Sequence, residues 1–244
     1  MNPLTRSYYS GASDAQIIYE TIGSYFDKIA NLHSTNSALV VRHQGINWTY
    51  GELQARVDQL AMGLIHLGIE PGDRVGIWGP NSSEWVLVQL ATAKIGAIMV
   101  CINPAYRLYE LEYALNKVEC KTLITDVSFK TSDYLGMINT LAPELESSHP
   151  GQLEAKKLPY LKHVIRMGSD NTPGMYNFDA VCAAGTDDDQ ATMDALQGRL
   201  QPDDAINIQF TSGTTGNPKG ATLSHCNILN NGFLTGLAMQ LGPE

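Results

Sequence analysis

The chain has 244 residues, of which 43% are hydrophobic and 17% charged, and 25 acidic side chains outweigh 16 basic ones to give a formal net charge of −9. This composition indicates a globular protein of one large or two modest domains and excludes an intrinsically disordered chain. The acidic balance argues against a nucleic-acid-binding protein, which needs a basic face. A small anionic ligand stays compatible with it, because one lysine and several backbone N–H groups can hold a phosphate.

Targeting signals and membrane spans are not predicted. The N-terminal stretch has no apolar segment typical of a signal peptide, and its single arginine is too few for a transit peptide. The most apolar window, 85–104, contains Gln89, Lys94 and Gly96, so it predicts a buried helix followed by a buried strand. The four cysteines have no metal or redox spacing and are interpreted as small core residues in a reducing compartment. We therefore expect a cytoplasmic protein without a membrane span.

The first 70 residues predict a helix and hairpin unit. Thr49 and Glu52 have the spacing of a capping box, which opens a helix with apolar residues every three or four positions. Gly45 is expected at a positive φ in the turn of the preceding hairpin. We expect this unit, residues 1–70, to pack on a second sheet supplied by downstream sequence.

From residue 71 to 244, short apolar runs alternate with helical patterns. Strands are predicted at 74–78, 97–102, 122–125, 163–167 and 206–210, and helices at 82–94, 108–118 and 129–141. The fold class is therefore α/β, with layered helices and a mostly parallel, doubly wound sheet. The polar, proline-containing segment 143–160 is predicted as a surface loop, and 184–204 as a helix start followed by another loop.

The stretch "FTSGTTGNPKGATLSH" (210–225) gathers hydroxyl side chains and glycines around one lysine. It matches neither the P-loop pattern nor the dinucleotide pattern, because Gly220 follows Lys219 and no glycine stands at position 215. Glycines let successive N–H groups point inward, hydroxyls add donors, and Lys219 adds a cation. The stretch predicts a loop that binds a phosphate chain.

This loop resembles the phosphate-loop motif of the adenylate-forming superfamily, which includes acyl-CoA synthetases, luciferases and nonribosomal adenylation domains. The blocks "NWTYGELQARVDQLAMGLIHLGIEPGDRVGIWGPNSSEW" and "ATAKIGAIMVCINPAYRLYELEYAL" are similar to further parts of that family. The resemblance covers most of residues 14–240 and is greatest to the medium-chain acyl-CoA ligase group.

The resemblance implies a two-step reaction in which a carboxylic acid, expected to be a medium-chain fatty acid, attacks ATP and the acyl-adenylate then passes to CoA. Lys219 would neutralise departing pyrophosphate and is the candidate catalytic residue. The implied nucleotide-binding residues are Thr211, Ser212, Gly213, Thr214, Thr215, Gly216, Asn217 and Lys219. Mg²⁺ is implied as a cofactor, but no metal ligand is assigned to this segment.

The family's later sequence blocks do not occur before Glu244, including the adenine, ribose and magnesium segments and the C-terminal domain. We expect an N-terminal fragment that is inactive alone and presents an apolar face to missing partners. Two alternatives stay open: another adenylate-forming enzyme, such as a carrier-protein-loading adenylation domain, and a stand-alone nucleotide-binding module. The sequence leaves the oligomeric state open.

Ser224 is predicted to cap a helix, with His225 either a helix-start residue or part of a ligand pocket in the complete enzyme. The acidic run Asp187–Asp189 is interpreted as a solvated loop and not a magnesium site.

Overall fold

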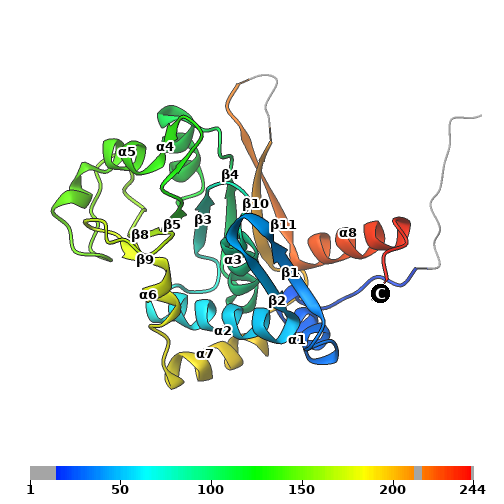
Figure 1. Cartoon of the computed structure of the whole chain (residues 1–244). Helices are drawn as coiled ribbons and strands as arrows, with labels where there is room; N and C mark the ends of the chain where they lie inside the picture. The colour runs from blue at the N-terminus through cyan, green and yellow to red at the C-terminus, as the bar shows by residue number, and fades with distance from the viewer. Residues whose placement is uncertain (1–14, 212–215, 243–244) are drawn as a thin grey trace, which may run out of the picture.

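A seven-stranded sheet forms the centre of the computed structural model, which describes residues 15–211 and 216–242 (Figure 1). Its strand order is β11-β10-β4-β3-β5-β8-β9, and all neighbouring pairs are parallel except β10 and β11. The strands are β3 (Arg74–Trp78), β4 (Ile98–Ile102), β5 (Thr122–Thr125), β8 (His163–Arg166), β9 (Tyr176–Asn177), β10 (Ala205–Thr211) and β11 (Lys219–Ser224). The predicted α/β class with a mostly parallel, doubly wound sheet is confirmed.

Helices cover both faces of this sheet. The helices of the described structure are α1 (Ile22–Leu32), α2 (Tyr50–His66), α3 (Ser83–Ile95), α4 (Leu108–Lys117), α5 (Tyr134–Leu141), α6 (Phe178–Cys182), α7 (Asp187–Gln197) and α8 (His225–Ala238), and all but α8 belong to the layers beside the sheet (Figure 1). One apolar core joins α2, α3, α6 and α7 to the sheet, and a second core lies under α4 and α5. Helix α2 thus shares its core with α3 and β3, which belong to the segment after residue 70. The domain boundary predicted at residue 70 and the second sheet expected from downstream sequence both stay predictions.

Local sequence signals account for the N-terminal elements. Strands β1 (Ser37–Val41) and β2 (Ile46–Thr49) form the expected hairpin, and Gly45 between them has a φ of 68°. Thr49 and Glu52 form the predicted capping box of α2, with both backbone-to-side-chain hydrogen bonds present. Such a box satisfies two N–H groups that the first helical turn leaves free, so the helix begins at a defined residue.

The helix predicted over 129–141 begins five residues later than expected. A short hairpin, β6 (Ser128–Phe129) and β7 (Ser132–Asp133), occupies its first part, with Lys130 at a φ of 54° in the turn. Asp133 then caps α5 by accepting a hydrogen bond from the N–H of Gly136. The positive φ at Lys130 is incompatible with a continuous helix.

The prediction of a surface loop over 143–160 was wrong for its apolar residues. Leu145, Leu153 and Leu158 are buried in the second core, and Pro143–Glu146 forms a short 3-10 helix. The polar residues of the segment face solvent while its leucines cover α4 and α5. The prolines and charged residues of this segment are therefore compatible with an irregular backbone whose leucines pack in the core.

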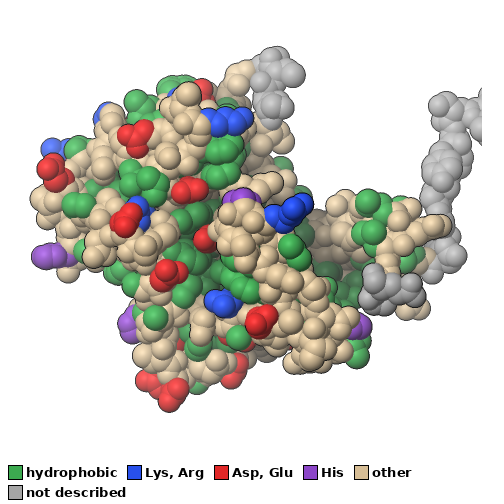
Figure 2. All heavy atoms as spheres, viewed as in Figure 1, with side chains coloured by type: hydrophobic (Ala, Val, Ile, Leu, Met, Phe, Trp, Pro, Cys, Tyr) green, Lys and Arg blue, Asp and Glu red, His purple; other side chains and the backbone are tan. Residues whose placement is uncertain are grey.

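Helix α8 lies outside the two helical layers (Figure 1). Apolar side chains are exposed along it, as Figure 2 shows on the right of the molecule. Leu234 and Leu237 of α8 are exposed, as is Met239 directly after the helix. Together with α1 it lines a shallow hollow of about 390 Å³. This is an exposed apolar face of the kind that the sequence predicted.

Candidate nucleotide site at the β10–β11 hairpin

Strands β10 and β11 lead into and out of the candidate phosphate loop, and the pair projects beyond the helical layers (Figure 1). Thr211 ends β10 directly opposite Lys219, the first residue of β11. The strand pair therefore brings the two ends of the loop together, even though seven residues separate them in the sequence. Ser212, Gly213, Thr214 and Thr215, four of the predicted binding residues, lie outside the described residues.

Gly216 supports the expectation that glycine is needed for the loop backbone. Its φ is 109°, a conformation that L side chains rarely adopt, and among the described residues, its chain neighbours aside, no atom lies within 4 Å of the position that a Cβ would take. The requirement is therefore conformational and not one of space. A valine at this position would strain the backbone of the loop.

Lys219 is exposed at the start of β11. Its carbonyl oxygen accepts a hydrogen bond of 3.4 Å from the hydroxyl of Thr211. Within the described ranges no ion pair includes the Lys219 ammonium group. A solvated cation that does not pair with a neighbouring carboxylate is suited to an anionic ligand.

Two tyrosines that the sequence reasoning did not select lie beside the hairpin. The hydroxyl of Tyr109, on α4, is 3.3 Å from Oδ1 of Asn217, and the ring of Tyr106 meets that of Phe210 edge to face at 6.4 Å. Both tyrosines follow β4, the strand next to β10. Strand adjacency, which needs the topology, is the signal that would have identified them.

The candidate outside the loop, His225, is the first residue of α8 and is fully buried. Its Nδ1 accepts a hydrogen bond of 3.1 Å from the backbone N–H of Ile22. Burial lowers the pKa of His225 to about 4, while the carboxylate of Asp204 acts in the opposite direction. The predicted cap is confirmed, because Ser224 accepts from the N–H of Asn227.

The acidic run is part of a helix. Asp187, Asp188 and Asp189 form the first turn of α7, which confirms the helix start predicted within 184–204. The interpretation of the acidic run as a loop was wrong, although Asp187 and Asp188 are exposed to solvent as expected. Asp189 completes a capping box with Thr186 and contacts Nδ1 of His66 at 3.1 Å. Carboxylates at this position are favoured by the helix dipole. In the part of the chain that the structure describes, no group of three His, Cys, Asp or Glu side chains could hold a metal ion.

The cysteines agree in part with the prediction. Cys120 is buried and the other three are partly buried, and all four are free thiols. Burial raises the pKa of the Cys120 and Cys182 thiols to about 12. Neither thiol is therefore suited to act as a nucleophile.

The parallel sheet and its helices define an α/β fold that matches the N-terminal domain of adenylate-forming enzymes. A long-chain-fatty-acid-CoA ligase from Archaeoglobus fulgidus superposes with a TM-score of 0.73 over 97% of this chain and 43% of that one, at 23% identity. The model of the AMP-binding enzyme family matches residues 26–242. The chain belongs to the AMP-binding enzyme family.

Two individual relatives with acyl-CoA ligase or synthetase names are similar to most of this chain. The chain is 45% identical over 236 residues to the medium-chain acyl-CoA ligase ACSF2, mitochondrial, of Rattus norvegicus. It is 39% identical over 217 residues to the putative acyl-CoA synthetase YngI of Bacillus subtilis. These matches cover 96% and 89% of this chain but only 38% and 40% of the relatives. The chain therefore spans about two fifths of their length.

No helix among the described residues has the length and apolarity needed to cross a membrane. The cytoplasmic location stays a prediction, since the rat relative is named as mitochondrial.

Proposed function

We propose that this chain is the N-terminal part of an acyl-CoA ligase that joins a medium-chain fatty acid to CoA with ATP. The acid attacks the α-phosphate of ATP to form an acyl-adenylate and pyrophosphate, and the CoA thiol then displaces AMP. The observation that carries the proposal is the β10–β11 hairpin, which holds Thr211 opposite the exposed Lys219, in a chain 45% identical to a medium-chain acyl-CoA ligase.

The hairpin contributes position and charge. In-line attack at phosphorus depends on holding the phosphate chain and on stabilising the charge of departing pyrophosphate. Thr211, Asn217 and Lys219 would donate hydrogen bonds to phosphate oxygens from the described ends of the loop, and Ser212–Gly216 would complete the loop. No described residue is assigned to Mg²⁺, which proteins commonly hold with one or two carboxylates together with the phosphates of the substrate.

Carboxylate-dependent exchange of pyrophosphate into ATP tests the proposal. The assay uses the longest native polypeptide containing this sequence and residues 1–244 alone, with short-, medium- and long-chain fatty acids and an aromatic acid. Exchange that requires an acid and is fastest with medium chains supports the proposal, and we expect none from residues 1–244 alone. ATP turnover that is indifferent to carboxylate would instead favour a stand-alone nucleotide-binding module.

Lys219→Ala is the matched loop variant, with Lys157→Ala as the control because Lys157 is an exposed lysine outside the hairpin. Loss of one charge-assisted hydrogen bond of about 1.5–3 kcal/mol predicts a decrease in exchange of about tenfold or more for Lys219→Ala. Equal activity of the two variants would remove Lys219 from the site. Transfer of the acyl group to a carrier protein and not to CoA would favour the adenylation-domain alternative.

A further inference from the structure

Strand β11 has little support of its own. It is the last strand of the sheet, pairs only with β10 in the described structure, and its first four residues, Lys219 to Thr222, are exposed. Side chains alternate between the two faces of a strand, so a slip of one residue would turn Lys219 to the opposite face. The position of Lys219 therefore depends on what holds the other end of β11.

That end is held by the first turn of α8. The backbone N–H groups of His225 and Cys226 donate to the carbonyl oxygens of Asp204 and Pro202 at 3.3 and 2.8 Å. The buried imidazole of His225 accepts the N–H of Ile22 at Nδ1. An imidazole that accepts at Nδ1 carries its proton on Nε2 and is neutral, which agrees with its lowered pKa.

A second contact lies one turn further along α8. The side-chain amide of Asn230 is almost completely buried and bonds both backbone groups of Ile18. Its Oδ1 accepts the N–H of Ile18 at 2.7 Å, and its Nδ2 donates to the carbonyl oxygen of Ile18 at 2.8 Å. Residues 18–22 are thus joined to α8 at two places that are more than 200 positions away in the sequence.

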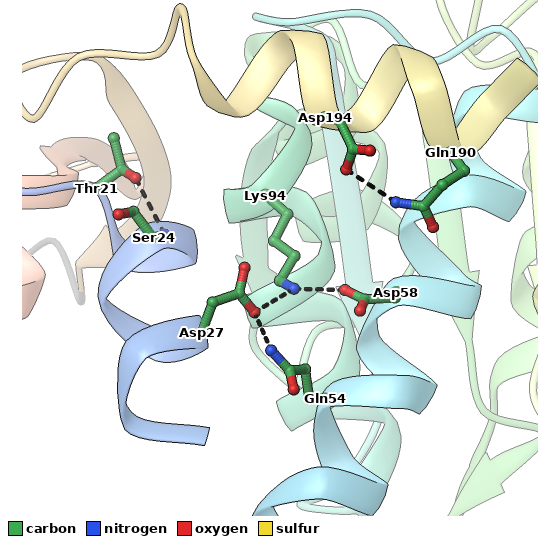
Figure 3. A network of polar contacts seen from close by, with 8 residues as sticks. All are labelled: Thr21, Ser24, Asp27, Gln54, Asp58, Lys94, Gln190 and Asp194. Carbon is green, nitrogen blue, oxygen red and sulfur yellow. Dashed lines mark hydrogen bonds and ion pairs between the residues drawn. The ribbon is translucent and has the colours of Figure 1, made fainter. Parts of the chain in front are cut away.

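Residues 18–22 lead directly into α1, which is itself fixed to the centre of the molecule. The ammonium group of Lys94, on α3, is 2.5 Å from Oδ1 of Asp27 on α1 and also contacts Asp58 on α2 (Figure 3). Gln54 donates to the same Asp27 oxygen at 2.7 Å. Lys94 is only 1% exposed, so breaking these contacts would leave a charge buried without a partner.

We propose that residues 18–22 form a brace that fixes the base of β11, and that His225 is a positioning residue for the phosphate loop. In this arrangement α1 fixes the position of the Ile22 N–H, and the hydrogen bond from that N–H fixes the His225 ring. Because His225 is the first residue of α8 and directly follows β11, its position determines where β11 ends. His225 acts without touching the nucleotide. The effect on ATP rests on the function proposed above, whereas the brace itself can be tested without any ligand.

The first experiment changes the acceptor. In His225→Asn the side-chain oxygen can take the place of Nδ1, whereas His225→Leu keeps a similar volume and removes the acceptor. Hydrogen exchange of the β11 amides is measured in the full-length protein without ligand. We expect exchange about tenfold faster in the leucine variant, and within about twofold of wild type in the asparagine variant, for the loss and the retention of one buried hydrogen bond.

The second experiment removes the donor. Ile22 is the first residue of α1, a position where proline is tolerated, and Thr21 before it has a φ of −76° and a ψ of 153°, which suit a residue preceding proline. Ile22→Pro therefore deletes one N–H without breaking the helix. Ile22→Val, which keeps the N–H and shortens the side chain, is the matched control. Faster β11 exchange is expected for proline and not for valine.

Kinetics then distinguish the brace from its effect on the nucleotide. In the pyrophosphate-exchange assay we expect the KM for ATP to rise about fivefold to tenfold in His225→Leu and Ile22→Pro, with the KM for the acid unchanged. Unchanged β11 exchange in both variants would overturn the brace. Faster exchange with an unchanged KM for ATP would overturn the positioning role of His225. A wild-type protein that does not use ATP would overturn the proposed function alone, because the exchange measurement needs no nucleotide.

Discussion

Helices α3 and α8 both follow a strand of the sheet and both are rich in apolar residues, yet the chain holds them in opposite ways. Eight of the 13 residues of α3 are buried, and they include Leu87, Val88 and Ala91 in the first core. The buried residues of α8 are two polar ones, His225 and Asn230, while Leu237 is 52% exposed. Burial of apolar surface thus positions α3, whereas α8 is held by the hydrogen bonds of His225 and Asn230 and by a small cluster in which its partly buried Ile228 and Leu229 pack against Ile22, Ala93 and Ile206. Changes in α3 should therefore affect mainly the stability of the sheet, whereas changes at the buried polar residues of α8 should affect mainly the position of the phosphate loop.

The largest predicted effect concerns the ion pairs beneath α3. Lys94→Met removes the cation and leaves Asp27 and Asp58 facing one another, which is expected to lower the free energy of unfolding by about 3 kcal/mol or more. Urea denaturation followed by circular dichroism measures it. The control is Lys28→Met, which breaks the exposed pair with Glu20 and is expected to cost less than about 1 kcal/mol. Equal costs would mean that the buried position of Lys94 adds nothing.

The next prediction uses acid to act on α8. Because burial lowers the folded-state pKa of His225 from 6.5 to about 4, the unfolded chain binds more protons between these values. The contribution of His225 to stability is therefore complete above about pH 6.5 and is lost as the pH falls towards 4. Denaturation of wild type and His225→Asn across pH 4–7 isolates it from other groups, such as His163, whose pKa burial also lowers. The two proteins should differ in slope within this window, and parallel curves would contradict the prediction.

The smallest effect is expected on the apolar face of α8. Leu237→Gln should change the free energy of unfolding by no more than about 0.5 kcal/mol, because the side chain is already half exposed. Val88→Asn, the corresponding change in α3, buries an amide in an apolar core and should cost about 3 kcal/mol or more. Thermal and urea denaturation of residues 1–244 measure both. A large loss in Leu237→Gln would show that another surface covers α8 in solution.

The sequence predicted the elements whose signals are local. Strand β3 was predicted with the bounds that it has, Gly45 was expected at its positive φ, and the capping box of α2 depends on two residues three positions apart. The turn at Lys130 was missed because no glycine or proline marks it, and the residue at the positive φ is a lysine. The contact between Ile22 and His225 spans 203 positions, so no local pattern contains it. Of the candidate site, the phosphate loop is a prediction from a local sequence pattern, whereas its neighbour Tyr109 could be identified only from the order of the strands.

Strand order also has a consequence for how the protein is made. Strand β4 pairs on one side with β3, which is synthesised before it. On its other side it pairs with β10, and the partner of Met99 there, Asn207, follows 108 positions later in the sequence. A ribosome that adds about 5–20 residues per second completes β10 about 5–20 s after β4. During that interval β4, a strand of apolar residues, has one open edge, and open edges recruit strands from other chains. The nascent protein must keep that edge from pairing elsewhere until the strand that carries the phosphate loop arrives to close it.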